Sequence, residues 1–490
     1  MTFTPTAEQT AILEAGVNTP APLLISALAG AAKTSTLVLL ARALPAQSTL
    51  CLAFNKRIAE EMTARMPAHV TCSTLSSLGY GAWRSFLSRR LIVKDGKTYF
   101  AVKAWFEENF SGPDLEEAWN RYDDIKSAVS SAKAIGYIPS AAERPSLKSL
   151  IDEDDFLDCL PFEPSDWELT CINSILTSSI KDGYSGIIDY DDMLYLPTLC
   201  SSASFPRHAV VMVDEAQDLS PLNHAMLAKL LGARSRLIAV GDPNQSIYAF
   251  RGADVSSMEK LESRFSMTPF PLTTSFRCAT SIVKEAQWRA PAMRAADNAP
   301  AGSVTYLSTW TPTDLSSPAV VVCRNNAPLF SLAIKLLAAG YHPTIAGKDI
   351  AAGLRKTLGK LGHPSMTISE ARVALDLWRE EQLDKKRNPG KVADMFECLS
   401  VFLAPPAKTL EDALLKLERV FNATGPISLM TIHKSKGLEF PVVHILDAGL
   451  IKVIDPNTGR QNVQEANLLY VAQTRAKTRL TYITSDGFRQ

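Results

Sequence analysis

The chain alternates short apolar runs with longer segments of helical periodicity. Runs without polar alternation lie at residues 23–29, 49–54, 209–213, 237–240, 319–322 and 442–446. Most of these runs are trailed by helical patterns, such as residues 34–44, which are rich in Leu and Ala. Strands that are apolar on both faces fit a parallel sheet covered by helices on both sides. The pattern therefore predicts an α/β fold.

Two long stretches lack these strand signals. Between about residues 84 and 186 the apolar positions take helical spacing, for example in residues 115–134. A second helical stretch contains segments 371–386 and 410–420, after which strand signals resume. We predict two α/β cores, each with a mostly helical insertion. The predicted division is 1–84 and 187–268 for the first core, 85–186 for its insertion, 269–347 and 423–490 for the second core, and 348–422 for the second insertion.

Composition narrows the classes of protein. The 490 residues, 46% of them hydrophobic, are enough for several buried cores. Charge is balanced at 51 basic and 51 acidic residues, so nucleic acid could bind only in a local groove. The eight cysteines form no Cys-x-x-Cys metal pattern, which indicates reduced core residues. The chain has no secretion-signal pattern at its start and no apolar run that would span a bilayer, so we expect a cytoplasmic protein without a membrane partner.

A small-residue loop after the first apolar run has the composition of a phosphate-binding loop. Its backbone N–H groups can surround phosphates, Lys33 can reach the β and γ oxygens, and the Thr34 hydroxyl can ligate Mg²⁺. Ala32 replaces the glycine usual before the lysine, and its methyl group is expected to crowd or strain the loop. Alone, the loop is equally compatible with a plain strand-to-helix turn. The residues expected to hold the nucleotide here are Ala29, Gly30, Ala31, Ala32, Lys33, Thr34 and Ser35.

Two later strand ends favour the nucleotide interpretation. The apolar run at 210–213 ends in Asp214 and Glu215. A strand-end Asp beside a phosphate loop can hold Mg²⁺, and the adjacent Glu can deprotonate the attacking water. The run at 237–240 leads to Gln245, a neutral side chain able to contact both a γ-phosphate and that water. Together these positions predict an ATP hydrolysis site.

The segment from Gly241 to Asp254, together with Asp214 to Asp218, resembles the UvrD/Rep/PcrA helicases of superfamily 1. The resemblance extends from Thr4 to Arg475 and implies two RecA-like P-loop domains. It implies that Gln9 reads the adenine edge, that Phe276 stacks on the base and that Glu439 binds the ribose. It also implies two arginines that reach the γ-phosphate, and these are Arg277 and Arg475, the latter as an arginine finger delivered by domain closure.

The resemblance also implies a track for single-stranded nucleic acid, in which aromatic side chains stack between successive bases. Phe250 takes the position of the family's stacking Trp. The residues carried over as nucleic-acid contacts are Phe54, Asn55, Thr74, Tyr248, Phe250, Arg251 and His433.

We therefore expect an ATP- and Mg²⁺-dependent DNA helicase that moves 3′ to 5′ on single-stranded DNA and acts at junctions of single and double strands. Three alternatives stay open. The short second insertion favours a translocase that strips proteins from single strands and unwinds poorly. Ala32 favours a nucleotide-switched binder that does not hydrolyse. Stacking and phosphate contacts do not inspect the sugar, so RNA is a third. A protein loading partner is compatible with each.

Overall fold

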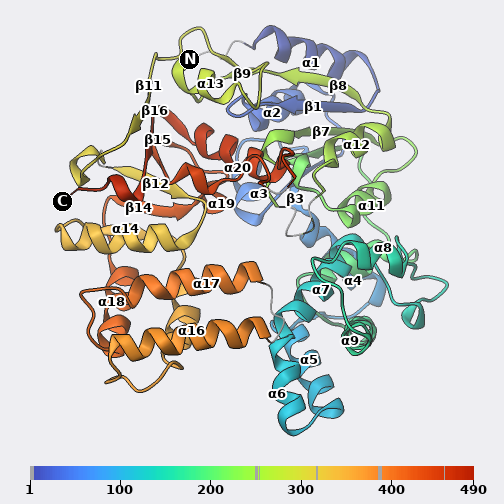
Figure 1. Ribbon diagram of the computed structural model, residues 1–490. Coiled ribbons are helices and arrows are strands. Elements are labelled where there is room, and N and C mark those ends of the chain that lie inside the picture. Colours follow the sequence, from blue (N-terminus) through green and yellow to red (C-terminus); the bar gives the residue numbers. More distant parts are fainter. Residues whose placement is uncertain are drawn as a thin grey trace. The chain divides into compact units, whose positions relative to one another are not determined.

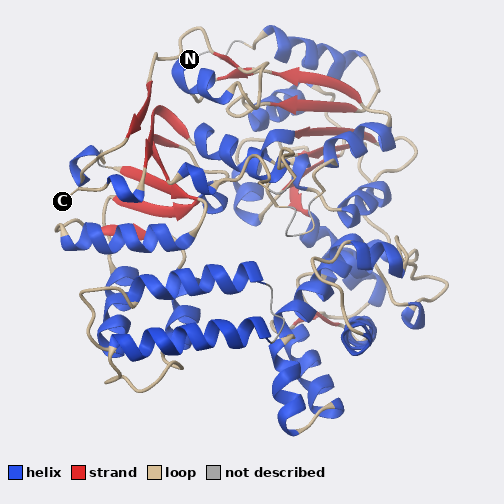
Figure 2. Ribbon diagram, in the orientation of Figure 1, coloured by secondary structure: helices blue, strands red, loops and turns tan. Residues whose placement is uncertain are grey.

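The computed structural model describes residues 5–248, 252, 254–315, 318–384, 389–456 and 458–489. Within these residues the chain forms two compact units, one ending at Thr273 and the other beginning at Thr274 (Figure 1). Each unit has its own β-sheet and its own set of helices (Figure 2). No described helix is both long enough and apolar enough to cross a membrane.

The first unit contains a parallel sheet of six described strands in the order β3-β2-β6-β7-β1-β8. Successive residues of each strand point to opposite faces, and both faces are apolar, which places the sheet between two layers of helices. The strands are β1 (Leu23–Ala27), β2 (Thr49–Ala53), β3 (Val70–Thr74), β6 (Val210–Val213), β7 (Arg236–Gly241) and β8 (Thr268–Leu272).

The helices divide between the two faces according to their buried residues. Ile12, Leu37 and Met62 come from helices that share one core with the sheet, whereas Met226 and Leu261 come from helices on the other. The first group is α1 (Ala7–Asn18), α2 (Lys33–Ala43) and α3 (Lys56–Thr63), and the second is α4 (Leu75–Leu87), α11 (Pro221–Leu230) and α12 (Ser257–Phe265). Helix α10 (Asp192–Leu199) packs on both α4 and α11.

The helical insertion of the first unit has a hydrophobic core of its own. Phe106, Val129 and Ile172 are among its buried residues. A short ladder closes it, in which β4 (Ile92–Val93) pairs with β5 (Ile187–Ile188). Its helices are α5 (Lys97–Asn109), α6 (Gly112–Asn120), α7 (Tyr122–Ile135), α8 (Glu153–Asp158) and α9 (Asp166–Tyr184) (Figure 1).

The second unit repeats the parallel architecture with the strand order β11-β16-β15-β12-β14-β13. Its sheet strands are β11 (Ser303–Leu307), β12 (Ala319–Cys323), β13 (Pro343–Ile345), β14 (Ile427–Thr431), β15 (Phe440–Leu446) and β16 (Ala476–Ile483). A separate short pair joins β9 (Thr274–Ser275) and β10 (Arg294–Ala295). The accompanying helices are α13 (Thr280–Ala286), α14 (Asn326–Ala338), α19 (Ile432–Ser435) and α20 (Val463–Thr474).

The second helical stretch is built differently from the first. Leu354, Leu375, Leu399 and Leu417 are buried in the same core cluster as α14 and the sheet residues around Leu429. This stretch is therefore an extension of the sheet's own core. Its helices are α15 (Lys348–Leu358), α16 (Ile368–Asp384), α17 (Pro389–Phe402) and α18 (Leu410–Asn422).

The α/β fold with two parallel sheets is confirmed, and all six apolar runs are strands of these sheets. The pattern did not predict β3, β8, β11, β13, β14 or β16. Four of these strands lie at sheet edges, and β8 and β11 are largely exposed, so they lack a continuous apolar run. The four-part division of the chain stays a prediction.

Candidate nucleotide site and nucleic-acid surface

The loop between β1 and α2 turns sharply before the helix begins at Lys33. Gly30 has a φ of 76° and Ala32 has φ 58° and ψ 40°, both in the left-handed region. For an alanine this conformation costs about 1–2 kcal/mol. The strain expected from Ala32 is therefore present, because the position calls for a backbone conformation that glycine adopts freely.

Two contacts join this loop to the end of β6. Lys33 Nζ donates to Glu215 Oε2 at 2.8 Å, and Thr34 Oγ1 donates to Asp214 Oδ2 at 2.8 Å. Parallel strands end at the same edge of a sheet, which explains how residues about 180 positions apart meet. Glu215 itself has a φ of 55°, so the turn after β6 is strained as well. The predicted pairing of the loop with the Asp-Glu strand is thus present in the geometry.

Two residues that the motifs did not single out connect this pair to Gln245. Gln217 Nε2 donates to Glu215 Oε2 at 2.6 Å, and Gln217 Oε1 accepts from the backbone N–H of Asp242 at 2.9 Å. Gln245 Nε2 then donates to Asp242 Oδ2 at 2.7 Å. Gly241 is required here, because a Cβ would lie 2.6 Å from the Gln217 side-chain oxygen. The sequence signal that could have identified Gln217 and Asp242 is their position as polar residues shortly after the ends of β6 and β7.

Charge at this edge is concentrated and buried. Burial raises the pKa of Asp214 to about 6, and the negative charge of Glu215 adds to the effect. Burial also raises the pKa of Asp242. For Lys33, burial works to lower the pKa, but Glu215, Asp242 and Asp214 together raise it above its ordinary value. One lysine therefore faces three buried or partly buried carboxyl groups, and this excess of negative charge favours the binding of a further cation.

The residues present fit a hard divalent cation. Thr34 Oγ1 and Asp214 Oδ2 offer a hydroxyl and a carboxylate oxygen 2.8 Å apart, the ligand type that Mg²⁺ prefers. Mg²⁺ commonly takes one or two protein oxygens and completes its shell with water and substrate phosphates. The positive charge of Mg²⁺ would also lower the raised pKa of Asp214.

Gln9 lies on α1, next to the start of α2. Its Oε1 accepts from the Thr6 backbone N–H at 3.1 Å, which caps α1, and its Nε2 donates to Thr36 Oγ1 at 3.0 Å. The side chain is 0% exposed. These contacts fix the amide beside the helix that carries Lys33. Recognition of adenine by Gln9 stays a prediction.

The predicted residues of the second unit form a second charged group. Arg277 Nε donates to Glu439 Oε2 at 2.7 Å, and Lys477 Nζ lies 2.5 Å from Glu439 Oε1. Although burial works to raise it, Lys477 and Arg277 hold the pKa of Glu439 below its ordinary value. Phe276, beside Arg277, is 48% exposed and presents an open aromatic face.

Arg475 lies next to this group, since Arg277 Nη1 donates to the Thr474 carbonyl at 3.4 Å, and Arg475 is 1% exposed. Its Nε donates to the Val471 carbonyl at 3.1 Å and one terminal nitrogen donates to the Leu438 carbonyl at 3.0 Å. The guanidinium therefore joins the end of α20 to the segment before β15. Delivery of Arg475 to a phosphate as an arginine finger stays a prediction, as does the ribose contact of Glu439.

Some candidate nucleic-acid residues meet in the first unit. The rings of Phe54 and Tyr248 are nearly parallel, with centroids 5.9 Å apart, and Phe54 is 47% exposed. Asn55 caps α3 by accepting from the Ile58 N–H, and Thr74 caps α4 by accepting from the Ser77 N–H. In the second unit, His433 lies half-buried on α19. Phe250 and Arg251 lie outside the described residues.

A strand-to-helix phosphate loop, a strand-end Asp-Glu pair and a third strand-end Gln on one parallel sheet define a P-loop nucleotide-binding protein. Comparison with known families identifies the family within this class. The UvrD/REP helicase N-terminal domain matches residues 6–266, and the UvrD-like helicase C-terminal domain matches residues 392–487. The chain belongs to the UvrD/REP helicase family.

Individual relatives agree with the family assignment. The F-box DNA helicase protein 1 of Schizosaccharomyces pombe is 24% identical over 97% of this chain and 57% of its own length. The F-box DNA helicase 1 of Gallus gallus is 26% identical over 96% of this chain and 48% of its own length. The ATP-dependent DNA helicase UvrD1 of Mycobacterium leprae is 26% identical over 56% of this chain and 38% of its own length. The chain thus spans about half the length of the first two relatives.

Proposed function

We propose that this chain is an ATP-dependent DNA helicase that moves 3′ to 5′ on single-stranded DNA and uses Mg²⁺ for hydrolysis. The observation that carries the proposal is the pair of contacts at the carboxyl edge of the first sheet. Lys33 meets Glu215 and Thr34 meets Asp214, each at 2.8 Å. A cation for phosphates, a metal-binding hydroxyl and two carboxylates with separate tasks are the parts that ATP hydrolysis requires.

These contacts support a separate task for each side chain. Lys33 leaves Glu215 for the β and γ oxygens when ATP enters, which frees the carboxylate to take a proton from the attacking water. Thr34 and Asp214 would hold Mg²⁺, whose charge would offset the negative charge that develops on the phosphates. Gln245 is tied through Asp242 and Gln217 to Glu215, so a change at the water position reaches the segment that follows Gln245.

Nucleic acid is bound by the aromatic surface of the same unit. Phe54 and Tyr248 present parallel rings, the kind of surface on which bases stack without regard to sequence. Asn55 and Thr74 cap α3 and α4, whose N-terminal N–H groups attract phosphate. Tyr248 follows Gln245 by three residues, so hydrolysis and base contact lie on one short segment. Phe250 and Arg251 continue that segment.

Strand displacement on tailed duplexes tests this proposal. Three DNA duplexes of equal sequence would carry a 3′ tail, a 5′ tail or no tail, with ATP and Mg²⁺ present. We expect separation of the 3′-tailed duplex alone, and none with Lys33→Ala or without Mg²⁺. Separation of the 5′-tailed duplex would refute the polarity. An RNA tail that serves as well as DNA would move the substrate assignment to nucleic acid in general.

A translocase that displaces proteins and unwinds poorly is favoured by one observation. The second helical stretch shares its core with the sheet and so is not an independent body. A protein bound tightly to single-stranded DNA can be released by ATP-driven movement even where a duplex is not opened. Release of that protein together with intact 3′-tailed duplex would select this second function. Loss of both, with ATP bound but not hydrolysed, would leave the nucleotide-switched binder.

A further inference from the structure

A buried network of charges attaches the helical insertion to the start of α10 and the turn before it. Lys133 Nζ on α7 lies 2.7 Å from Asp192 Oδ1 and 2.8 Å from Asp189 Oδ2. Lys97 Nζ on α5 lies 2.6 Å from Asp192 Oδ2. Lys133 and Asp192 are 1% and 0% exposed. Burial works to lower the pKa of Lys133, but Asp192 and Asp189 raise it above its ordinary value, so Lys133 keeps its charge.

Such a network is a poor way to gain stability, because removing ions from water costs nearly as much as their attraction returns. It does define geometry, since each buried charge must keep its partners. Helix α7 is therefore held in one position relative to α10. Helix α10 in turn packs tightly on α4, where a Cβ at Gly79 would lie 1.8 Å from the Met193 carbonyl oxygen.

The next residue along α7 contacts the segment that follows Gln245. A Cβ at Gly252 would lie 2.8 Å from the Ala134 Cβ, which is too close for two carbons. Gly252 also has a φ of +81°, in the left-handed region. Glycine at 252 thus permits both the backbone conformation and the close approach of α7. Gly252 follows Gln245 by seven residues.

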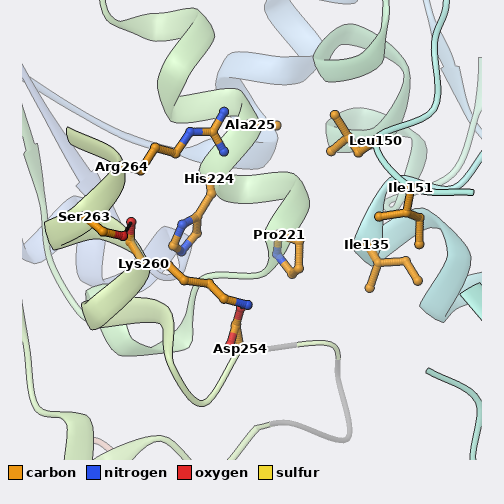
Figure 3. Close-up of a pocket in the computed structure, with 10 residues that line it drawn as sticks. All are labelled: Ile135, Leu150, Ile151, Pro221, His224, Ala225, Asp254, Lys260, Ser263 and Arg264. Carbon is orange, nitrogen blue, oxygen red and sulfur yellow. Dashed lines mark hydrogen bonds and ion pairs between the residues drawn. The ribbon is translucent and has the colours of Figure 1, made fainter. Parts of the chain in front are cut away.

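Beside this contact the insertion and the core are separated by a cavity of about 460 Å³. Figure 3 shows Ile135 and Leu150 on one side and His224 and Lys260 on the other. Lys260 forms an ion pair with Asp254 at 2.5 Å, which ties the segment after Gly252 to α12 of the core. Ile135 and Asp254, which line the cavity, are close in the chain to Ala134 and Gly252, so this contact joins the insertion to the core at the edge of the cavity. A displacement of Gly252 would therefore act directly on α7.

We propose that α7 mechanically links Gln245 to the helical insertion, with Lys133 as the positioning residue that holds Ala134 against Gly252. The proposal rests on the proposed function, in which Gln245 responds to ATP hydrolysis. Movement of the segment after Gln245 displaces Ala134. Helix α7 transmits this displacement to the other helices of the insertion, because Lys133 anchors α7 at Asp189 and Asp192. DNA bound to the first unit would affect hydrolysis through the same contacts, from α7 through Gly252 to Gln245.

A double-mutant cycle at Gly252 and Ala134 tests the link. ATP hydrolysis would be measured without DNA and with increasing oligo(dT) for wild type, Gly252→Ala, Ala134→Gly and the double variant. Gly252→Ala adds a methyl group that meets Ala134, whereas the double variant keeps the strained φ and removes the clash. Gly340→Ala is the matched control, because Gly340 has the same φ of +81° with nothing within 4 Å of its Cβ position.

We expect Gly252→Ala to lower the DNA stimulation of hydrolysis by about two- to thirty-fold, the range over which single substitutions change coupling. Hydrolysis without DNA should stay near wild type. Ala134→Gly should restore most of the stimulation in the double variant, and Gly340→Ala should leave it unchanged. A double variant no better than Gly252→Ala would overturn the link, since backbone strain alone would then explain the loss. Wild-type stimulation in Gly252→Ala would overturn it equally.

Lys133 is tested against the other lysine of the network. Lys133→Met and Lys97→Met each remove one cation from Asp192, so both are expected to lower the thermal unfolding temperature. Lys133→Met alone should also reduce DNA stimulation, because it releases α7. Equal stimulation in both variants would overturn the role of Lys133. If wild type itself shows no DNA-stimulated hydrolysis, the proposed function fails before the link is reached, so the two failures are distinguishable.

Discussion

Glu215 in the first unit and Asp447 in the second occupy the same backbone setting with different consequences. Each lies at the end of an apolar parallel strand, has a positive φ of 55° or 49°, and precedes a short 3-10 turn. Glu215 faces Lys33 and Gln217. Asp447 accepts from the backbone N–H of Ser485 at 2.8 Å and from its hydroxyl. The same strained turn thus presents a carboxylate to the phosphate loop in one unit and fixes the C-terminal segment in the other.

The comparison shows that the strand-end geometry is general to these sheets and that the chemistry comes from what lies opposite. In the first unit the opposite element is the phosphate loop with its single lysine. In the second unit the cations are the arginines at 277 and 475, which contact groups of their own unit. Under the proposed function, the first unit would supply the hydrolytic groups and the second would supply cations for a phosphate. Substitutions in both units test that division.

Arg277→Ala should lower kcat for ATP by about three decades or more, the scale for an arginine that stabilises a transferred phosphoryl group. Steady-state hydrolysis at saturating ATP measures this. Lys477→Ala is the matched control, because Lys477 contacts the other oxygen of Glu439. If the two variants lose turnover equally, Arg277 serves only the ion pair with Glu439, and the division between the units fails.

Glu215→Gln should reduce turnover by about two to four decades, the contribution of a positioned general base. ATP binding should persist, since Lys33 and Thr34 are unchanged, and nucleotide titration would measure it separately from hydrolysis. Turnover close to that of wild type would assign the base to another residue.

Asp447→Ala should show the opposite pattern. It removes the acceptor for two hydrogen bonds from Ser485, and loss of a charged acceptor of this kind costs about 1.5–3 kcal/mol of folding free energy. Chemical denaturation would detect the loss, while kcat at a temperature well below unfolding should stay within a factor of about two to three of wild type. A large fall in kcat with stability intact would mean that Asp447 also takes part in hydrolysis.

Ala32→Gly should change nucleotide affinity by about 1 kcal/mol or less. Ala32 already holds the left-handed conformation that glycine would adopt, so the folded loop should change little and the effect should stay within the usual range of Gly/Ala backbone effects. Isothermal titration with a non-hydrolysed ATP analogue would measure the difference. A gain of several decades in hydrolysis would instead show that Ala32 disables the loop, which is the premise of the nucleotide-switched alternative.

Much of the first site could be predicted from sequence, because its residues follow apolar strands whose ends converge in any parallel sheet. Lys33, Thr34, Asp214 and Glu215 were all placed in this way. The links through Gln217 and Asp242 could not be predicted, since they depend on side-chain directions in two separate turns. The contact of Ala134 with Gly252 was also beyond the pattern, because helical periodicity does not state which distant loop a helix meets.

The fold shows the same limit. The six predicted strands are all central in their sheets, whereas the central strands β14 and β16 and the exposed edge strands such as β8 and β11 were not predicted. The inward-bonded guanidinium of Arg475 is a further example, because a motif gives its place along the chain and not the carbonyls that surround it.

The proposed function is tested most directly by the rate of ATP hydrolysis with Mg²⁺, measured with and without single-stranded DNA. We expect a rate that rises with DNA concentration to a plateau in wild type and is abolished under both conditions in Lys33→Ala. A wild-type rate that is absent, or that is the same with and without DNA, would contradict the claim that the nucleotide site of the first unit drives movement along DNA.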